Sequence, residues 1–536
     1  MGSALQSLDY AVFLLYFVIV SGYGYWIYLK KKSGENTAND FFLAEGSLTW
    51  WAIGASLIAS NISAEQFVGM SGSGFAMGLA IASYEWMAAA TLLVVAVFFM
   101  PGYIKNRIFT MPQFLEKRYS PLVATMMAVF WLLVYVFVNL TSILYLGAIA
   151  VSTISGFSFT ACAVGLAVFA IFITLGGMKV IAYTDVIQVV ILVLGGLFTT
   201  YLALDLVAQQ FGSQGAMAGL SLIRDQAPDH FHMIFEKGDK YYKDLPGLTV
   251  LIGAMWIANL NYWGCNQYIT QRALGAKLET ARSGLLFAAF LKLLMPIIVV
   301  LPGIAAYVLH QKGMFQQEMM NAAGEVKPDR AYPVLLNLLG PGLKGLSFAA
   351  LTAAIVASLA GKANSIATIF TLDLYNKYVD KDAGEAKQVS VGRWVIIGSM
   401  IIAVLVAPQL QKLEQGFQFI QEFTGLISPG VVAIFLLGFF WKRATANAAL
   451  VAALITIPLG IAFKKYMPEV PFLDQMGYAF AIIVALMVAI SLADPKSKDN
   501  PKAMEVDTSM FKTSQAFAVG ALLVLGVLAA LYIVFW

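Results

Sequence analysis

Ionisable and amide side chains stand inside otherwise apolar segments of this 536-residue chain. Glu85 and Lys292 are each the only charge deep in a segment long enough to cross a bilayer. Insertion of a charge at such depth costs about 2.5–3.5 kcal/mol. The carboxamides of Gln66, Asn259 and Gln421 lie in similar segments. Together these groups offer one acceptor, one donor and three groups that do both, which suits a neutral solute rich in hydroxyl groups.

A purely structural interpretation of the two charges is also open. Glu85 and Lys292 could form an ion pair that only holds helices together, or Lys292 could extend along the membrane to its surface. Lys292 stands about nine residues from the start of its apolar segment, which argues against extension to the surface.

Four apolar or aromatic residues could complete a solute site. Tyr262 could stack against the apolar face of a ring, and Met70, Tyr84 and Phe417 could close the cavity. A single aromatic residue in such a place is more often packing than gate. The coincidence of these residues with the polar set favours the functional interpretation.

The elements that must position these residues contain two polar interruptions. The first is Ser60 to Gln66, and the second, Asn259 to Gly264, follows about two hundred residues later. In a bilayer such a break is tolerated only where it is buried in protein or lines an aqueous cavity. Two interrupted helices at corresponding places in two halves of a chain are typical of the central site of a secondary transporter.

Composition predicts an all-α integral membrane protein. Hydrophobic residues make up 60% of the chain and charged residues 12%, about half the share of charge in a soluble domain. Most apolar runs reach the twenty residues needed to cross about 30 Å of hydrocarbon. The sequence predicts fourteen transmembrane helices, near residues 10–29, 51–71, 77–102, 121–153, 158–177, 180–205, 248–272, 283–309, 344–375, 390–409, 413–440, 444–464, 474–493 and 513–535.

These helices are predicted to form a single membrane transport domain over residues 1–536. Helices two to six and seven to eleven are two groups of five, each opening with a broken helix. An odd number of spans inverts the second group relative to the first. The core repeats therefore cover about 51–205 and 248–440, with peripheral helices at 10–29 and 444–535.

Lysine and arginine counts predict the orientation. With the N-terminus outside, the inner loops carry 21 basic residues and the outer segments 11. This asymmetry places both termini on the extracytoplasmic side of the cell (inner) membrane. Lys464 and Lys465 run against the rule. The net charge of +4 follows from this topology, so the lipid bilayer is the expected partner and nucleic acid is not.

Catalytic chemistry has little support. Cys162 and Cys265 fall in predicted helices and are expected to be buried thiols. The histidines, His230, His232 and His310, lack metal-ligand spacing, and we expect neither an enzyme nor a bound cofactor.

Longer motifs resemble the sodium-solute symporter family, and within it the bacterial sodium/galactose (sodium/glucose-type) symporters. They are Trp51 to Gln66, Ser71 to Gly74, Tyr84 to Trp86, Gly176 to Met178, Tyr183 to Asp185, Asn259 to Arg272, Ala353 to Asn364 and Phe417 to Pro429. The resemblance implies a LeuT-like core of two inverted five-helix repeats, fourteen helices and alternating access. It also implies transport of a monosaccharide with sodium as the coupling ion.

By motif position the resemblance implies roles for individual residues. The sugar contacts would be Gln66, Glu85, Asn259, Lys292 and Gln421. Tyr262 would close the inner side against the sugar and be held by Asn61. Met70, Tyr84 and Phe417 would form the outer gate.

The chain departs from the family at the implied sodium site. That site would use carbonyls of Ala59, Ile62 and Ala354 and two adjacent hydroxyls, which fall at Ala357 and Ser358. One hydroxyl is therefore missing, although a hard cation prefers several oxygen ligands. A second departure is Ala88 in place of a serine at the sugar site, worth about 1 kcal/mol for one hydrogen bond.

Lys362 stands one turn after Ser358, where the family has an apolar residue. Helical side chains lean toward the N-terminus of their helix. Lys362 could therefore bond the Ala59 and Ile62 carbonyls, or pair with Asp185, and so replace or compete with sodium. The alternative is a solvated charge in the cytoplasmic vestibule, with sodium still bound by the remaining ligands.

The predicted function is secondary active transport of a galactose- or glucose-like monosaccharide, with sodium coupling implied by the resemblance. One alternative is a sodium-independent, proton-linked or weakly coupled sugar carrier in which Lys362 occupies or perturbs the cation site. Another is a membrane sensor that binds sugar without moving it, which we expect to carry an output domain.

Overall fold

The computed structural model describes residues 5–29, 48–63, 65–176, 178–320, 324–337, 339–412 and 416–536, without the side chains of 28, 178–180, 411–412 and 416–419. Within these ranges the chain is almost wholly helical. One isolated antiparallel bridge joins Met320 and Val326.

The helices of the first half are α1 (Ser7–Leu29), α3 (Trp50–Asn61), η2 (Glu65–Met70), α4 (Ser71–Met77), η3 (Gly78–Ala82), α5 (Ser83–Val94), η4 (Val95–Phe99), α6 (Met100–Lys105), α7 (Met111–Arg118), α8 (Pro121–Leu133), η5 (Val134–Leu140), α9 (Thr141–Ser155), α10 (Phe159–Thr174), α11 (Met178–Gln210), α12 (Ala216–Gln226) and η6 (Pro228–Phe231).

Those of the second half are α13 (Leu248–Ile252), α14 (Ala254–Gly264), α15 (Gln267–Leu274), α16 (Leu278–Val299), α17 (Leu301–Gln311), η7 (Pro328–Arg330), α18 (Ala331–Leu336), α19 (Leu343–Thr368), η8 (Ile369–Tyr375), α20 (Asn376–Tyr378), α21 (Glu385–Val406), η9 (Ala407–Lys412), α22 (Gly416–Phe440), α23 (Ala446–Tyr466), α24 (Phe472–Ala493), η10 (Pro495–Ser497), η11 (Thr508–Phe511) and α25 (Gln515–Val534).

Eleven helical runs among the described residues are long and apolar enough to cross a membrane. They are Ser7–Ile27, Glu65–Lys105, Pro121–Ser155, Ile181–Gln210, Leu278–Gln311, Leu343–Tyr378, Glu385–Leu410, Ile420–Phe440, Ala446–Tyr466, Phe472–Ala493 and Gln515–Val534. The prediction of fourteen continuous spans is therefore not confirmed. Of the three predicted spans without a continuous counterpart, 51–71 and 248–272 are broken helices. The third, 158–177, contains α10, whose 16 residues fall short of a bilayer core at 1.5 Å per residue.

The first break lies where the sequence predicts it. α3 ends at Asn61, because Ile62 adopts an extended backbone with φ −79° and ψ 95°. The chain resumes as the π-helical turn η2 and continues as α4. Gln66 Oε1 accepts hydrogen bonds from the backbone N–H and the hydroxyl of Ser63, at 3.1 and 3.3 Å. The polar residues of the break thus satisfy backbone groups that an interrupted helix leaves open.

The half-helix η2–α4 ends at Gly78. This residue has φ 72°, and a Cβ atom there would lie 2.3 Å from the carbonyl oxygen of His230. Only glycine meets both conditions. The run Glu65–Lys105 is therefore a half-helix followed by a second element that begins at Gly78.

The second break lies a few residues later than predicted. Residues Asn259 to Gly264 belong to α14, and the helix stops at Cys265 before α15 begins. The side chain of Asn266 caps α15 by accepting a hydrogen bond from the N–H of Tyr268 at 3.1 Å. The polar residues of α14 are tolerated within a helix because they face other polar groups or the cavity described below. The polarity of residues Asn259 to Gly264 therefore did not predict where the helix ends.

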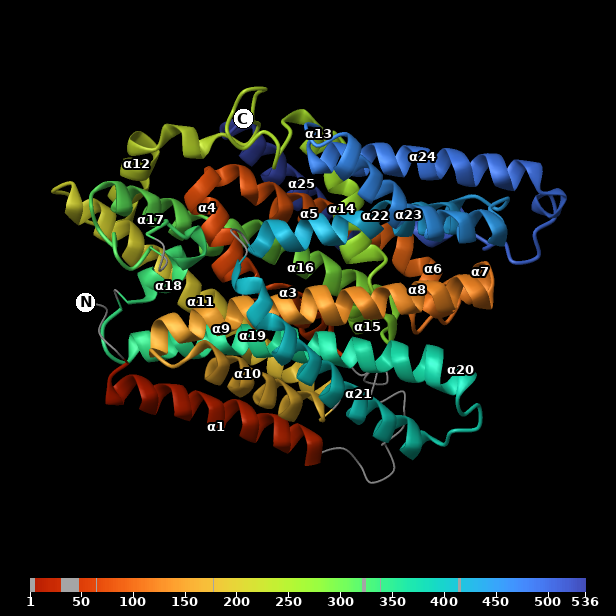
Figure 1. Ribbon diagram of the computed structural model, residues 1–536, viewed down its shortest axis with the longest axis horizontal. Coiled ribbons are helices and arrows are strands. Elements are labelled where there is room, and N and C mark those ends of the chain that lie inside the picture. Colours follow the sequence, from red (N-terminus) through yellow and green to blue (C-terminus); the bar gives the residue numbers. More distant parts are fainter. Residues whose placement is uncertain are drawn as a thin grey trace.

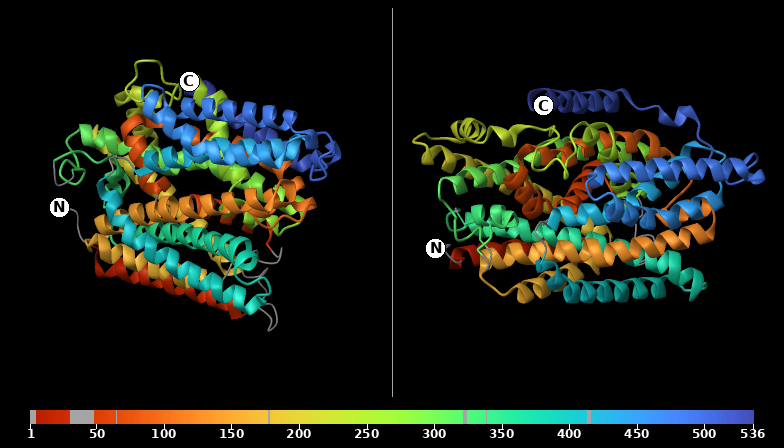
Figure 2. Two further views of the ribbon diagram at one scale, coloured as in Figure 1. Left: turned by 45° about the vertical axis from the view of Figure 1, so that its right-hand side comes forward. Right: turned by 45° about the horizontal axis from the view of Figure 1, so that its top comes forward.

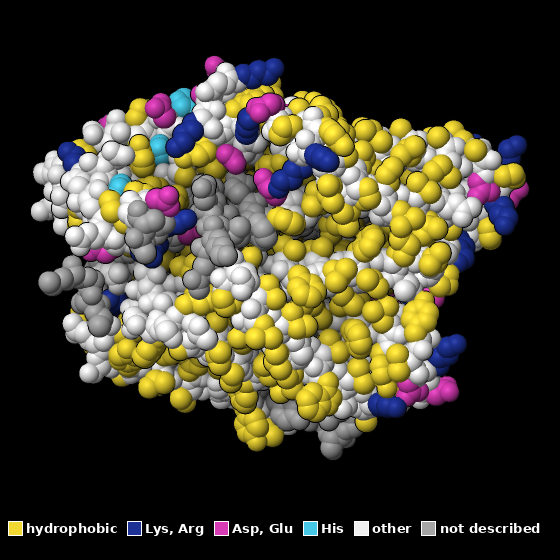
Figure 3. Space-filling view, viewed as in Figure 1, with side chains coloured by type: hydrophobic (Ala, Val, Ile, Leu, Met, Phe, Trp, Pro, Cys, Tyr) yellow, Lys and Arg dark blue, Asp and Glu magenta, His cyan; other side chains and the backbone are white. Residues whose placement is uncertain are grey.

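Most long helices run in roughly one direction, so loops gather at two ends of the molecule (Figures 1 and 2). The start of α1 and the end of α25 both lie in the left half of Figure 1. Hydrophobic side chains cover the middle of the visible face, and many Lys and Arg side chains lie toward its ends (Figure 3). This distribution is typical of a protein whose central belt lies in lipid.

α19, which contains Ala354, Ala357 and Ser358 of the implied cation site, is connected to α1 at its start. The buried carboxylate of Asp9 accepts the backbone N–H groups of Gly342 and Gly345 at 2.7 and 2.9 Å. A carboxylate at a helix N-terminus satisfies open donors and complements the helix dipole.

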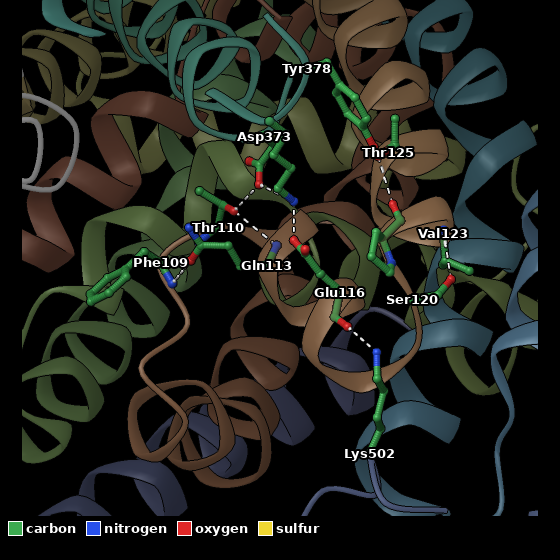
Figure 4. Close-up of polar contacts among 12 residues, drawn as sticks. Phe109, Thr110, Gln113, Glu116, Ser120, Val123, Thr125, Asp373, Tyr378 and Lys502 are labelled. Carbon is green, nitrogen blue, oxygen red and sulfur yellow. Dashed lines mark hydrogen bonds and ion pairs between the residues drawn. The ribbon is translucent and has the colours of Figure 1, made fainter. Parts of the chain in front are cut away.

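At the opposite end of the same helical run, a polar cluster joins α7 to η8 and α20 (Figure 4). Thr110, the N-cap of α7, donates its hydroxyl to Asp373 Oδ1 at 3.2 Å. Glu116 pairs with Lys377, whose ammonium also lies 3.9 Å from Asp373. Lys502 reaches the Glu116 carbonyl at 3.3 Å.

The same helix α7 is tied to the second broken helix. Gln267, the first residue of α15, accepts the N–H of Met111 at 2.8 Å and donates to the carbonyl of Phe109 at 3.3 Å. α7 thus connects the second half of a broken helix to the end of the α19–η8 run. It therefore fixes α15 relative to the end of the run that carries Ser358.

Candidate functional site

A cavity lies where the two broken helices meet α5, α16, α22 and α24. Its lining residues are Asn61, Glu65, Gln66, Met70, Tyr84, Glu85, Ala88, Ala258, Asn259, Tyr262, Trp263, Lys292, Gln421, Thr424, Gly425, Ser428, Phe472, Leu473 and Met476. All six predicted solute contacts are in this set: Gln66, Glu85, Asn259, Tyr262, Lys292 and Gln421. Asn61, Met70, Tyr84 and Ala88 line the cavity as well. The side chain of Phe417 lies outside the described residues.

Glu85 and Lys292 form a buried ion pair. The ammonium lies 2.5 Å from the Glu85 carboxylate, and the two side chains are 3% and 1% exposed. Lys292 does not extend to a membrane surface, which excludes that alternative. Its ammonium also donates to Asn61 Oδ1 and lies 5.1 Å from the ring centre of Trp263.

Asn61 connects this ion pair to Tyr262. Its carbonyl oxygen accepts from Lys292, and its Nδ2 donates to the Tyr262 hydroxyl at 3.1 Å. The last residue of α3 therefore holds an aromatic residue of α14 at the cavity wall. The predicted contact between Asn61 and Tyr262 is present.

The carboxamides are only partly free to meet a solute. Gln66 Oε1 is occupied by Ser63 at the break, and Asn259 Nδ2 donates to the Met255 carbonyl at 3.1 Å. Gln421 is half-buried on α22 and lines the cavity from the opposite side. One polar atom of each side chain, Oε1 of Gln66 and Nδ2 of Asn259, therefore already makes a hydrogen bond within the protein.

Two of the implied cation ligands, Ser358 and Ala59, lie close together beside the first break. Ser358 of α19 donates its hydroxyl to the carbonyl of Ser60 at 2.9 Å and lies 3.4 Å from that of Ala59. Because α3 stops at Asn61, these carbonyls are among the last of the helix and have no i+4 partner within it. Ala357 is buried next to Ser358 and offers only a methyl group.

Lys362 does not take the position expected from the sequence. It makes no described hydrogen bond to the carbonyls of Ala59 or Ile62, nor to Asp185. Its ammonium lies 3.8 Å from the ring centre of Tyr268 and contacts Asn139 Oδ1 at 3.5 Å. The aromatic face gives a buried ammonium an electrostatic partner that a carbonyl would otherwise supply.

The second alternative for Lys362 also fails. The side chain is 2% exposed, so it is not a solvated charge in a vestibule. Its attraction to Glu65 is the chief favourable charge interaction it makes. Glu65 also lines the solute cavity, so the carboxylate that attracts Lys362 is part of the cavity wall.

Asp185 belongs to a separate buried network. Its Oδ2 accepts the Ser56 hydroxyl at 2.7 Å, and Ser56 in turn accepts from Arg272 Nε at 2.9 Å. Arg272 and Asp185 are each 1% exposed, so one serine joins two buried opposite charges. The network ties α3 and α11 to α15.

Comparison with known proteins decides the family. The model of the sodium:solute symporter family matches residues 41–456. A sodium/glucose cotransporter of Vibrio parahaemolyticus is 48% identical over 540 aligned residues, which cover 99% of each chain. The chain belongs to the sodium:solute symporter family.

More distant members of this family and its fold agree with that assignment. The sodium/myo-inositol cotransporter 2 of Oryctolagus cuniculus is 36% identical over 485 residues, 85% of this chain and 70% of the relative. Among solved structures, a Na⁺-coupled sialic acid symporter in a substrate-bound outward-open state superposes with a TM-score of 0.78. It covers 91% of this chain and 98% of that one at 22% identity, which establishes the shared fold.

Nine cavity residues of this symporter were not identified in the sequence analysis: Glu65, Ala258, Trp263, Thr424, Gly425, Ser428, Phe472, Leu473 and Met476. Glu65 and Trp263 lie within the two polar interruptions described above, so their positions in the sequence could have identified them as cavity residues. Ser428 accepts a hydrogen bond from Asn261 at 2.9 Å, and a contact between residues so far apart in the sequence is visible only in the structure. Phe472 belongs to α24 and resembles any lipid-facing residue in the sequence.

A second, wider cavity of about 650 Å³ adjoins the first. It lies among α22, α23 and α24, and the two cavities share Gly425, Phe472 and Met476. Its rim carries Asp244, whose pKa is raised by burial and by the nearby charge of Glu422. Lys464, one of the two lysines that run against the charge rule, pairs with Glu422 at 2.7 Å. The two cavities are therefore neighbours at α22 and α24.

Proposed function

We propose that this chain is a secondary active transporter that moves a galactose- or glucose-like monosaccharide together with sodium by alternating access. The observation that carries the proposal is the cavity at the two helix breaks, in which a buried Glu85–Lys292 pair stands among carboxamides and aromatic rings. The 48% identity to the Vibrio sodium/glucose cotransporter supports the same assignment over the full chain.

The chemistry of the cavity favours a neutral polyol. Because Glu85 and Lys292 neutralise one another, this pair offers no free charge for the carboxylate or ammonium of an amino acid. Glu85 and the carbonyl of Gln421 can accept from sugar hydroxyls, and Lys292 and the carboxamide N–H groups can donate to them. Tyr262 provides an aromatic face for the apolar side of a pyranose ring. We therefore assign Gln66, Glu85, Asn259, Tyr262, Lys292 and Gln421 as sugar contacts.

The sodium ion, as co-substrate, would bind where α3 ends. The carbonyls of Ala59 and Ile62, the Ala354 carbonyl and the Ser358 hydroxyl are oxygen donors of the kind that a hard cation prefers. Ser358 faces the Ala59 and Ser60 carbonyls. The methyl group of Ala357 contributes nothing, so this site has fewer side-chain ligands than the family pattern implies.

Alternating access requires gates on both sides of the sugar. Tyr262, held by Asn61, would close the inner side, and Met70, Tyr84 and Phe417 the outer side. We further propose fourteen membrane segments, of which three are short or broken. They would form two inverted repeats, about 51–205 and 248–440, in the inner membrane with both termini extracytoplasmic.

A second candidate is sugar transport with weak or absent sodium coupling. The specific observations in its favour are Ala357, which removes a ligand, and the buried ammonium of Lys362 beside the first break. This candidate keeps the sugar site unchanged and differs only in the driving ion.

Uptake by the purified protein in proteoliposomes tests both candidates. Labelled galactose and glucose are offered with an inward gradient of sodium, potassium or protons in turn. Sodium-driven accumulation, competed by unlabelled sugar and not by amino acids, is the expected result. Equal uptake under all three gradients would favour the second candidate, and absence of uptake of either sugar would overturn the proposed substrate class.

A further inference from the structure

We propose that the buried ammonium of Lys362 sets the sodium dependence of this transporter. Its ammonium opposes the binding of sodium beside the first helix break, so sugar uptake needs more sodium than it would with a neutral residue at 362. The inference rests on the proposed function, because it assumes that sodium and sugar are carried together.

The first step is the position of the ammonium. Lys362 lies on α19, one turn after Ser358, and is 2% exposed. The Nζ atom lies 3.8 Å from the ring centre of Tyr268 and 4.7 Å from that of Tyr135, with Asn139 Oδ1 at 3.5 Å. The two rings hold the ammonium in one place inside the protein.

The second step is its closeness to the break. The Tyr268 hydroxyl donates to the Ser60 carbonyl, which also accepts from the Ser358 hydroxyl at 2.9 Å. A single tyrosine ring therefore separates the Lys362 ammonium from the carbonyls at the end of α3. Charges this deep in a protein are screened far less than charges at a surface.

The third step is the balance of charge around the break. Two buried cations, Lys362 and Arg272, repel one another there. Glu65 attracts Lys362, and Asp185 attracts Arg272 through the bridging Ser56. These four groups sum to zero when all are ionised. A sodium ion would add an uncompensated positive charge, whereas with a neutral residue at 362 it would bring the group to zero.

The carboxylate partner connects this charge to the sugar. Glu65 opens η2 and lines the solute cavity, and its N–H donates to the Ser63 hydroxyl at 3.0 Å. The carboxylate of Glu65 would attract both an approaching sodium ion and the ammonium of Lys362, and the two cations would repel one another. Lys362 is thus a determinant of ion affinity that acts through the charge of the region, without being a ligand of the ion.

The test measures labelled galactose uptake in proteoliposomes as a function of sodium concentration. Lys362→Met keeps the length of the side chain and removes its charge, and should lower the half-saturating sodium concentration at least tenfold. Lys362→Arg keeps the charge and should stay within threefold of the parent chain. Lys344→Met, which removes a buried lysine at the other end of α19, is the matched control and should leave the sodium dependence unchanged.

Glu65→Gln gives an independent reading should Lys362→Met fold poorly. It leaves both cations with one carboxylate and should raise the half-saturating sodium concentration at least tenfold. An unchanged sodium dependence in either folded variant would overturn the inference. Failure of the proposed function has a different signature, namely no sugar uptake by the parent chain under any cation gradient.

Discussion

The ammonium of Lys292 lies 2.5 Å from the carboxylate of Glu85, although the two residues are 207 positions apart in the chain. The pair joins α16 to α5 in the wall of the solute cavity, and Asn61 extends it to the first helix break. A buried ion pair is weak evidence for stability on its own. Its position among hydrogen-bonding groups and aromatic rings is the reason that we propose a role for it in sugar binding.

Removal of one member of this pair should harm folding and binding together. Glu85→Gln or Lys292→Met leaves one uncompensated buried charge, which costs about 3–5 kcal/mol. We expect a clear fall in the apparent unfolding temperature in detergent and loss of galactose binding. The double variant should recover much of the unfolding temperature but no galactose binding. Recovery of binding in the double variant would show that the pair is only structural.

The hydroxyl of Tyr262 should control the gate more than the affinity. Tyr262→Phe keeps the ring and removes the acceptor for Asn61 Nδ2, a loss of about 1 kcal/mol. Galactose binding should change less than threefold, while efflux of preloaded sugar should rise about fivefold, the factor that corresponds to 1 kcal/mol. Efflux at the parent rate would remove Asn61 and Tyr262 from the gate.

A methyl group at residue 361 should disturb the Arg272 network. A Cβ atom there would lie 2.4 Å from Arg272 Nη2 and 2.9 Å from the Tyr268 ring. Overpacking of this kind costs about 1–3 kcal/mol. Gly361→Ala should therefore lower the apparent unfolding temperature and the uptake rate.

Gly398 in α21 is the matched control, because a Cβ atom there has open space. Gly398→Ala should be neutral or stabilising by up to about 1 kcal/mol through helix propensity. Equal behaviour of the two alanine variants would contradict the crowding argument.

Arg118 should be the main anchor between α7 and the end of α22. Its guanidinium donates to the carbonyls of Gly438 at 2.7 Å and of Trp441 and Ala444 at 3.0 Å. Hydrogen bonds to charged groups contribute about 1.5–3 kcal/mol each to stability, so Arg118→Met should lower the apparent unfolding temperature strongly. Lys117→Met changes an exposed neighbour and should have an effect within about 0.5 kcal/mol. Similar losses in both variants would contradict the anchor role.

Much of the cavity could be predicted from the sequence, because isolated polar groups in apolar segments have few stable places to go. Glu85 and Lys292 are conspicuous for this reason, and the first break was located correctly. The second break was misplaced, since Asn259 and Asn261 remain helical by facing the cavity and Ser428. The contribution of Phe472 could not be predicted, because an apolar residue of α24 has the same sequence signature toward lipid as toward a cavity.

The surroundings of Lys362 show the same limit. The direction in which a helical side chain leans is predictable, and it suggested the carbonyls of α3 or Asp185. The ammonium actually contacts the aromatic rings of Tyr135 in η5 and Tyr268 in α15. Both residues lie far from Lys362 in the sequence. Only the packing of these helices determines which group an ammonium meets.

Equilibrium binding of labelled galactose to the purified protein in lipid nanodiscs tests the central claim most directly. The claim is that the cavity between the two helix breaks binds sugar together with sodium. The account predicts saturable binding that strengthens as sodium replaces potassium and that falls at least tenfold in Gln421→Leu, which alters only the half-buried wall of the cavity. Binding that is indifferent to sodium and equal in the parent chain and Gln421→Leu would contradict it.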